Sequence, residues 1–149
     1  MIEEKILQEK EIWRELGNKE KRLSILKKLE QEGVIIADLE HTYIESTVRI
    51  GKGTFILPNV FIFSNAVIGE KCIIWSSNVI IGGKLGIFVV IESFSKIEEA
   101  EIGDYVTIRS HSKVAKGSKL GNKCKIGTQA CLRLGAIIEE GVDVGRVYV

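Results

Sequence analysis

Residues 44–62 read IESTVRIGKGTFILPNVFI, with an isoleucine at every sixth position. The spacing continues to residue 80, and a second series of branched aliphatic residues repeats with the same period from residue 102 to residue 144. The members are Ile44, Ile50, Ile56, Ile62, Ile68, Ile74 and Ile80, then Ile102, Ile108, Val114, Leu120, Ile126, Leu132, Ile138 and Val144. Four residues after most of them stands a small side chain. A fixed period of this kind indicates a repeat architecture.

The two series are out of phase, because residues 80 and 102 lie 22 positions apart, which is not a multiple of six. Leu85, Ile91 and Ile97 divide the gap into steps of five, six, six and five residues. If each short step counts as a full side, glycine follows every third aliphatic position, at Gly51, Gly69, Gly86, Gly103 and Gly121. This column indicates a corner that needs either a positive φ or a close approach of stacked backbones.

A side of six residues is too short for a helix but suits a short strand followed by a corner. In a helix, a spacing of six would place successive aliphatic side chains about 120° apart, so they would form no single stripe. Three sides close a triangular prism, and its coils stack as parallel strands about 4.8 Å apart. The sequence therefore predicts a mainly β fold, a parallel β-helix of about six triangular coils over residues 33–149.

The first 32 residues differ in composition, being nearly free of glycine and rich in Glu, Lys and Leu. Apolar residues at helical spacing predict two short helices, interrupted at Gly17-Asn18 and ended near Gly33. The apolar positions are Ile2, Ile6, Trp13 and Leu16, then Leu23, Leu26 and Leu29. Their faces need a partner, which is either the first coils of the same chain or those of a neighbour.

Composition excludes several classes of protein. The chain of 149 residues carries 21 basic and 20 acidic side chains, and a net charge of +1 gives no electrostatic reason to expect a nucleic acid or a membrane surface as partner. The apolar runs fall short of the roughly 20 residues of a membrane span, and no secretion signal opens the chain. Three cysteines fit a reducing compartment better than a disulfide framework. We therefore expect a cytoplasmic protein.

The six-residue pattern of aliphatic residues and glycine resembles that of the hexapeptide-repeat acyltransferases, whose prism winds left-handed, against the usual crossover rule. The segments Glu32-Gly-Val-Ile-Ile-Ala-Asp38, Thr42-Tyr-Ile44 and Ile56-Leu-Pro-Asn59 resemble, more narrowly, the helix-to-prism junction of one bifunctional family. That family comprises the N-acetylglucosamine-1-phosphate uridylyltransferase/glucosamine-1-phosphate acetyltransferases. The match extends over about residues 12–80, and Leu39 stands where the family usually has proline. A left-handed β-helix is what this resemblance implies.

A later segment, Ile126-Gly-Thr-Gln-Ala-Cys-Leu-Arg-Leu-Gly-Ala136, resembles the part of the family that holds an arginine in contact with the sugar phosphate. The resemblance makes Arg133 the substrate-binding residue. A second register, one coil earlier, aligns Ile108-Arg-Ser-His-Ser-Lys-Val114 with the same segment and places Ala115 at the arginine position. We favour Arg133, and the second register stays open.

Few other side chains are candidates for metal binding or catalysis. The two histidines are too few for a three-histidine zinc site, and we predict no metal site. His111 falls near a corner, where a histidine in a cleft between trimer subunits can act as a general base on an attacking amine or hydroxyl. It is the catalytic candidate, and an ordinary surface role is the alternative. Cys72 and Cys124 occupy inward positions that predict core packing.

Exposed apolar side chains point to self-association. Residues that directly follow the inward aliphatic residues should face outward. On two sides of the prism, these positions place Leu57 above Trp75 and Phe63 above Ile81. Stacked exposed apolar residues usually mark an interface, so we predict a homotrimer through these four residues. Cover by the N-terminal helices of the same chain is the alternative. A last coil without a capping helix also suggests end-to-end stacking or a separate catalytic chain.

Two functions from different classes remain open, and the residues alone do not decide whether the chain is an enzyme. The resemblance implies an acyltransferase that acts on a sugar phosphate or related amine, with acetyl-CoA as co-substrate and no tightly bound cofactor. The family's uridylyltransferase domain and catalytic coils have no counterpart in this sequence. We therefore expect a trimeric, non-catalytic scaffold or subunit, with the acyltransferase as the alternative.

Overall fold

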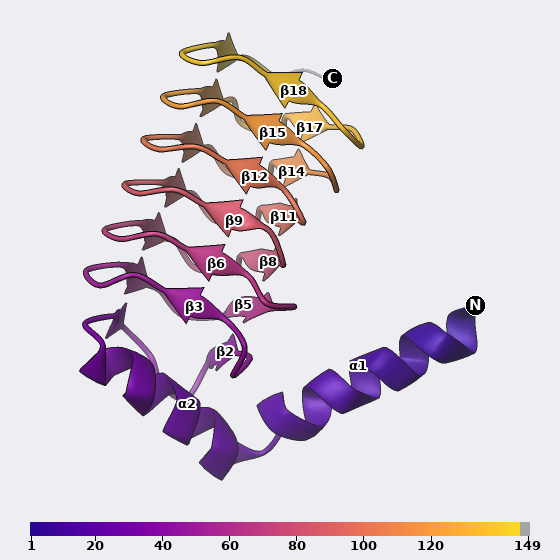
Figure 1. Cartoon of the computed structure of the whole chain (residues 1–149), viewed down its shortest axis with the longest axis vertical. Helices are drawn as coiled ribbons and strands as arrows, with labels where there is room; N and C mark the ends of the chain where they lie inside the picture. Colours follow the sequence, from indigo (N-terminus) through magenta and orange to yellow (C-terminus); the bar gives the residue numbers. More distant parts are fainter. Residues whose placement is uncertain (147–149) are drawn as a thin grey trace.

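The fold begins with two helices, as the sequence predicts. The computed structural model describes residues 1–146, and residues 147–149 of the predicted prism lie outside the described part. Helix α1 spans Ile2–Leu16 and helix α2 spans Lys19–Gln31. Asn18 caps α2, because its side chain accepts a hydrogen bond from the backbone N–H of Lys21 at 3.0 Å. Both helices lie at one end of a rod of stacked coils, and the C-terminus lies at the other end (Figure 1).

The rod is a parallel β-helix whose short strands form three sheets. Sheet A contains β1 (Ile35–Ile36), β4 (Phe55–Ile56), β7 (Ile73–Ile74), β10 (Val90–Ile91), β13 (Thr107–Ile108), β16 (Lys125–Ile126) and β19 (Asp143–Val144). Sheet B contains β2 (Thr42–Ile44), β5 (Val60–Phe63), β8 (Val79–Ile81), β11 (Lys96–Glu98), β14 (Lys113–Val114) and β17 (Cys131–Leu132). Sheet C contains β3 (Arg49–Ile50), β6 (Val67–Ile68), β9 (Lys84–Leu85), β12 (Glu101–Ile102), β15 (Lys119–Leu120) and β18 (Ile137–Ile138). The prediction of a mainly β prism of about six coils is confirmed.

The strand register confirms the phase slip. Ile80 pairs with Ile97 in sheet B, and Leu85 pairs with Ile102 in sheet C. Both five-residue steps therefore fall at the corner between sheets B and C, in successive coils. Every member of the six-residue series is buried, and the aliphatic side chains form one continuous core along the axis.

The glycine column is explained by close packing of the coils. None of its five members has a positive φ. A Cβ atom on Gly51 would lie 2.6 Å from the backbone nitrogen of Glu70 in the next coil, which is closer than real Cβ contacts. Of the two explanations that the sequence leaves open, the close approach of stacked backbones is therefore the correct one.

The helical end is joined to the prism by a buried arginine and a group of aromatic rings. Arg22 of α2 is 6% exposed, and its Nη1 donates hydrogen bonds to the carbonyl oxygens of Leu39 at 2.6 Å and Thr42 at 3.3 Å. Its guanidinium lies 5.0 Å from the ring centroid of Tyr43. Tyr43 stacks on Phe61 at 4.8 Å, and Trp13 of α1 contacts both rings. Helix α1 is thereby held against the outer face of sheet B.

Candidate functional site

Arg133 lies on the outer face of sheet B, directly after β17, and its side chain is exposed. The strand register places Lys113 of β14 above Lys96 of β11, and Cys131 above Lys113. The lower strands of the same face carry Tyr43, Phe61, Phe63, Val79 and Ile81. The face therefore changes from apolar near the helices to basic near the C-terminal coils.

His111 lies at the corner between sheets A and B. Its backbone is in the left-handed region, with φ 59°, and its N–H donates to the carbonyl oxygen of Ser93 at 3.1 Å. The imidazole is exposed and stacks on the ring of Phe94, with centroids 5.1 Å apart. One face of the imidazole therefore packs against Phe94.

The two candidate residues, His111 and Arg133, lie apart in the fold. His111 precedes the sheet-B strand β14, whereas Arg133 follows the sheet-B strand β17. A strand rises about 3.3 Å per residue, so the two residues lie at opposite edges of the sheet-B face. Within one chain, a ligand phosphate on Arg133 would not lie beside the imidazole of His111.

One pair of polar side chains, His41 and Asp38, is not predicted from the sequence. Nδ1 of His41 lies 2.9 Å from Oδ2 of Asp38, in the turn that joins α2 to the prism. Oδ1 of Asp38 accepts hydrogen bonds from the backbone N–H groups of Glu40 at 2.9 Å and His41 at 3.2 Å. The hydrogen bond from the His41 side chain is the main cause that lowers the pKa of Asp38. Both contacts fold the turn, so we assign this pair a structural role.

The cysteines divide as the sequence predicts. Cys72 and Cys124 are fully buried, and burial raises the pKa of both thiols, which disfavours the nucleophilic thiolate. Cys131 on the outer face of sheet B is half-buried. Among residues 1–146, no group of three His, Cys, Asp or Glu side chains is arranged to share a metal ion.

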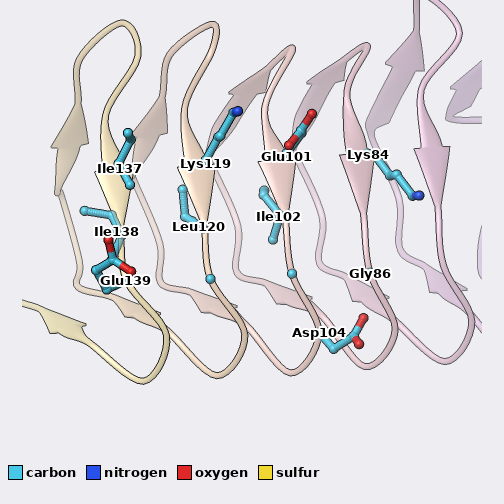
Figure 2. A pocket seen from close by; sticks show the side chains of 12 residues that line it. Lys84, Gly86, Glu101, Ile102, Asp104, Lys119, Leu120, Ile137, Ile138 and Glu139 are labelled. Atoms are coloured by element: carbon cyan, nitrogen blue, oxygen red, sulfur yellow. The ribbon is translucent and has the colours of Figure 1, made fainter.

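A shallow groove of about 550 Å³ runs along the outer face of sheet C (Figure 2). One wall carries Lys84, Glu101 and Lys119 on neighbouring strands, so charges of opposite sign alternate along it. The floor is the glycine column, which close packing already explains. At the other edge, Asp104 Oδ1 accepts a hydrogen bond from the N–H of Ile87 at 2.9 Å, a contact that joins successive coils. These features account for the groove without a ligand.

The four predicted interface residues lie on two different sheets. Leu57 and Trp75 are on the outer face of sheet A, where Trp75 is 43% exposed. Phe63 and Ile81 lie on sheet B, half-buried beside α1, and line a groove together with Ile6 and Trp13 of that helix. In the part of the chain that the structure describes, neither helix has the length and apolar character to cross a bilayer.

Comparison with known proteins finds bifunctional GlmU proteins among the curated relatives of the chain. The chain is 39% identical over 124 residues to the bifunctional protein GlmU of Alkaliphilus oremlandii, a match that covers 83% of this chain and 23% of the relative. It is 41% identical over 103 residues to the GlmU of Geotalea uraniireducens, covering 69% of this chain and 22% of the relative. The GlmU of a Geobacillus species is 37% identical over 125 residues, a match that covers 84% of this chain and 23% of the relative. The chain thus spans less than a quarter of the length of these curated relatives.

No family model matches the chain. Two solved structures of the acetyltransferase domain of PglB from Neisseria gonorrhoeae FA1090 match with TM-scores of 0.42 and 0.45, at 18% and 17% sequence identity. They cover 89% and 83% of this chain and 59% and 56% of the PglB chains, and the second is a complex with acetyl coenzyme A. These TM-scores are too low to indicate a close structural match.

The resemblance predicted from the sequence is confirmed. The six-residue period, the three-sheet prism and the GlmU relatives agree with a left-handed hexapeptide-repeat β-helix of the acyltransferase type.

Proposed function

Because the chain resembles the hexapeptide-repeat acyltransferases in repeat, fold and sequence, we propose that it acts as a homotrimeric subunit of this acyltransferase-like class. One observation carries the proposal. The outer face of sheet A is apolar through its first four strands, which present Ile35, Phe55, Leu57, Ile73, Trp75 and Val90. Ile35 is 53% exposed and Phe55 is 36% exposed. A contiguous exposed apolar surface of this kind usually marks an interface.

A homotrimer fits this surface better than a monomer does. The same face on three copies can pack around one axis, and closed symmetry is usual for soluble homo-oligomers. The sheet-A pair Leu57 and Trp75 forms the centre of the proposed interface. Phe63 and Ile81 complete it only where α1 of the same chain leaves them accessible, because they lie on sheet B beside that helix.

The geometry of the candidate residues favours a subunit role over catalysis by one chain. A general base has to reach the proton that it removes, within hydrogen-bond distance or through one water. His111 and Arg133 lie at opposite edges of sheet B, so a single chain does not place base and phosphate-binding group together. We therefore infer a scaffold, or a subunit that completes an active site with residues of another chain.

The apolar face is tested by sedimentation velocity on the wild type and on Trp75→Glu. We expect the wild type to sediment as a trimer and the variant as a smaller species, because a buried unpaired charge disfavours the interface. Leu134→Glu is the matched control, since Leu134 is 77% exposed and lies outside sheet A. Equal sedimentation of all three proteins would contradict the proposal.

A second function, acyl transfer to a sugar phosphate or related amine from acetyl-CoA, is favoured by the similarity to the bifunctional GlmU proteins. The exposed Arg133 and Lys113 would hold the phosphate there. Thermal shift with acetyl-CoA, UDP-N-acetylglucosamine and glucosamine-1-phosphate tests it, because a ligand that binds only the folded state raises the melting temperature. A saturable shift that Arg133→Ala removes and Lys52→Ala retains would support this function. No shift at millimolar ligand would exclude it in favour of the scaffold.

A further inference from the structure

A groove separates the N-terminal half of α1 from the outer face of sheet B. Its volume is about 630 Å³, within the range of small-molecule sites. Ile6 and Trp13 of α1 form one wall, and Phe63 and Ile81 of sheet B form the other. Ile6 is 50% exposed, so α1 covers the sheet without closing onto it. The groove is therefore an apolar, accessible slot.

The slot opens onto basic side chains. The rim contains Lys5 and Lys10 of α1 and Lys96 of β11, with Glu9 and Glu98 as its acidic members. Lys96 pairs with Glu98 at 4.0 Å. Lys113 lies directly above Lys96 in the strand register, and no carboxylate of residues 1–146 lies within ion-pair distance of its ammonium group. Like charges directly opposite each other in a sheet destabilise it. Since Lys96 already pairs with Glu98, an anion at this point would pair chiefly with Lys113 and would offset the repulsion between the two lysines.

The apolar and basic parts lie in neighbouring columns of sheet B. Phe63 and Ile81 are followed in their column by Glu98, and Lys96 and Lys113 continue the adjacent column of Val79. Ile81 ends β8, and β11 and β14 follow it in sheet B. Neighbouring strands are about 4.8 Å apart, so the apolar slot and Lys113 are about 10 Å apart along the rod. A ligand that fills both parts needs an apolar chain and a negatively charged end.

We propose that α1 and sheet B form a binding site for a single-chain anionic amphiphile, with its acyl or alkyl chain between Ile6, Phe63 and Ile81. Its carboxylate or phosphate group lies against Lys96 and Lys113. The charge complementarity selects the anionic head, and burial of the chain raises affinity severalfold for each methylene. This site goes beyond the proposed subunit function. It lies on α1 and sheet B, whereas Leu57 and Trp75, the centre of the proposed trimer interface, lie on sheet A.

Isothermal titration calorimetry on the full chain tests the site, with ligands kept below their micellar concentrations. Dodecyl phosphate and dodecanoate, which represent the two head groups, should bind saturably, and octyl phosphate should bind at least tenfold more weakly than dodecyl phosphate. Inorganic phosphate and the neutral dodecyl maltoside should not bind measurably. Equal binding of the neutral and anionic amphiphiles, or no binding of either anionic one, would overturn the proposal.

Variants locate the ligand. Ile6→Glu and Lys113→Glu should each weaken dodecyl phosphate binding at least tenfold, whereas Leu134→Glu, at an exposed apolar position outside both the slot and sheet A, should leave it unchanged. Ile6 lies on the exposed helix, so its substitution leaves the prism core intact. Unchanged binding in Ile6→Glu would contradict the proposal. A change in the sedimenting mass of the Ile6→Glu variant would also contradict the proposal, because the slot would then be a contact between copies of the chain.

Discussion

The side-chain oxygen of Asn78 accepts a hydrogen bond from the backbone N–H of Ser95, 2.8 Å away in the next coil. Nδ2 of the same amide donates to the carbonyl oxygens of Trp75 at 2.9 Å and Ile91 at 3.2 Å. Asn78 is fully buried, yet its polar side-chain atoms have partners. This explains why a large polar residue stands where the repeat otherwise places a small one.

Replacing Asn78 should therefore be costly. Asn78→Ala leaves the N–H of Ser95 and the carbonyl oxygen of Trp75 without the amide partner, whereas the carbonyl of Ile91 keeps its bond from the N–H of Trp75. An unpaired buried polar group costs about 1–3 kcal/mol. Urea unfolding followed by circular dichroism measures the loss, with the exposed Lys52→Ala as control. If the two variants unfold at the same urea concentration, the buried amide does not join the coils.

The glycine column gives a second prediction. A Cβ on Gly51 would lie 2.6 Å from the nitrogen of Glu70, whereas a Cβ on Gly145 would have no neighbour within 4 Å among residues 1–146. Neither residue has a positive φ. Gly51→Ala should lose about 1–3 kcal/mol through overpacking, and Gly145→Ala should change stability little. Similar melting temperatures of the two variants would show that backbone contact does not select glycine in the column.

Asp38 should make stability depend on pH in the acid range. Its pKa in the folded protein lies below the ordinary value of about 3.9, chiefly through the hydrogen bond from His41. The stabilisation is therefore fully present above the unfolded pKa and is lost as the pH falls through the folded pKa. Asp38→Asn should melt below the wild type at neutral pH and approach it in acid. A difference that stays constant over the whole range would contradict this account.

The three thiols should differ in reactivity. Burial raises the pKa of Cys72 and Cys124, whereas Cys131 is partly exposed on sheet B. Titration of the native protein with a disulfide reagent should give one fast thiol per chain, and Cys131→Ser should remove it. Three thiols should react in urea. Rapid reaction of either remaining thiol in the native Cys131→Ser variant would show that the core is open.

The six-residue period predicts nearly all of the prism. Each side buries one aliphatic residue, and counting from that residue assigns every other residue to a position on its side. Even the two five-residue steps are predictable, from Leu85, Ile91, Ile97 and the glycine column. The period does not say which outer face a helix covers. It places Leu57 with Trp75 on one side and Phe63 with Ile81 on another, as the structure does, but it does not indicate that α1 lies beside the second pair.

The position of the helices depends on contacts that have no sequence period. Arg22 is one of many charged residues in α2, and nothing in its spacing indicates that it is buried against Leu39 and Thr42. The pairing of Asp38 with His41 likewise depends on the turn that joins α2 to the prism. The candidate residues Arg133 and His111 can be placed on coils from the sequence. Their separation across sheet B needs the structure.

Self-association of three prisms through the apolar face of sheet A can be measured by native mass spectrometry of the wild-type protein. We expect one dominant species at three times the chain mass of 16.6 kDa, converted to smaller species by Trp75→Glu. A wild-type protein that remains at 16.6 kDa across the micromolar range would contradict it.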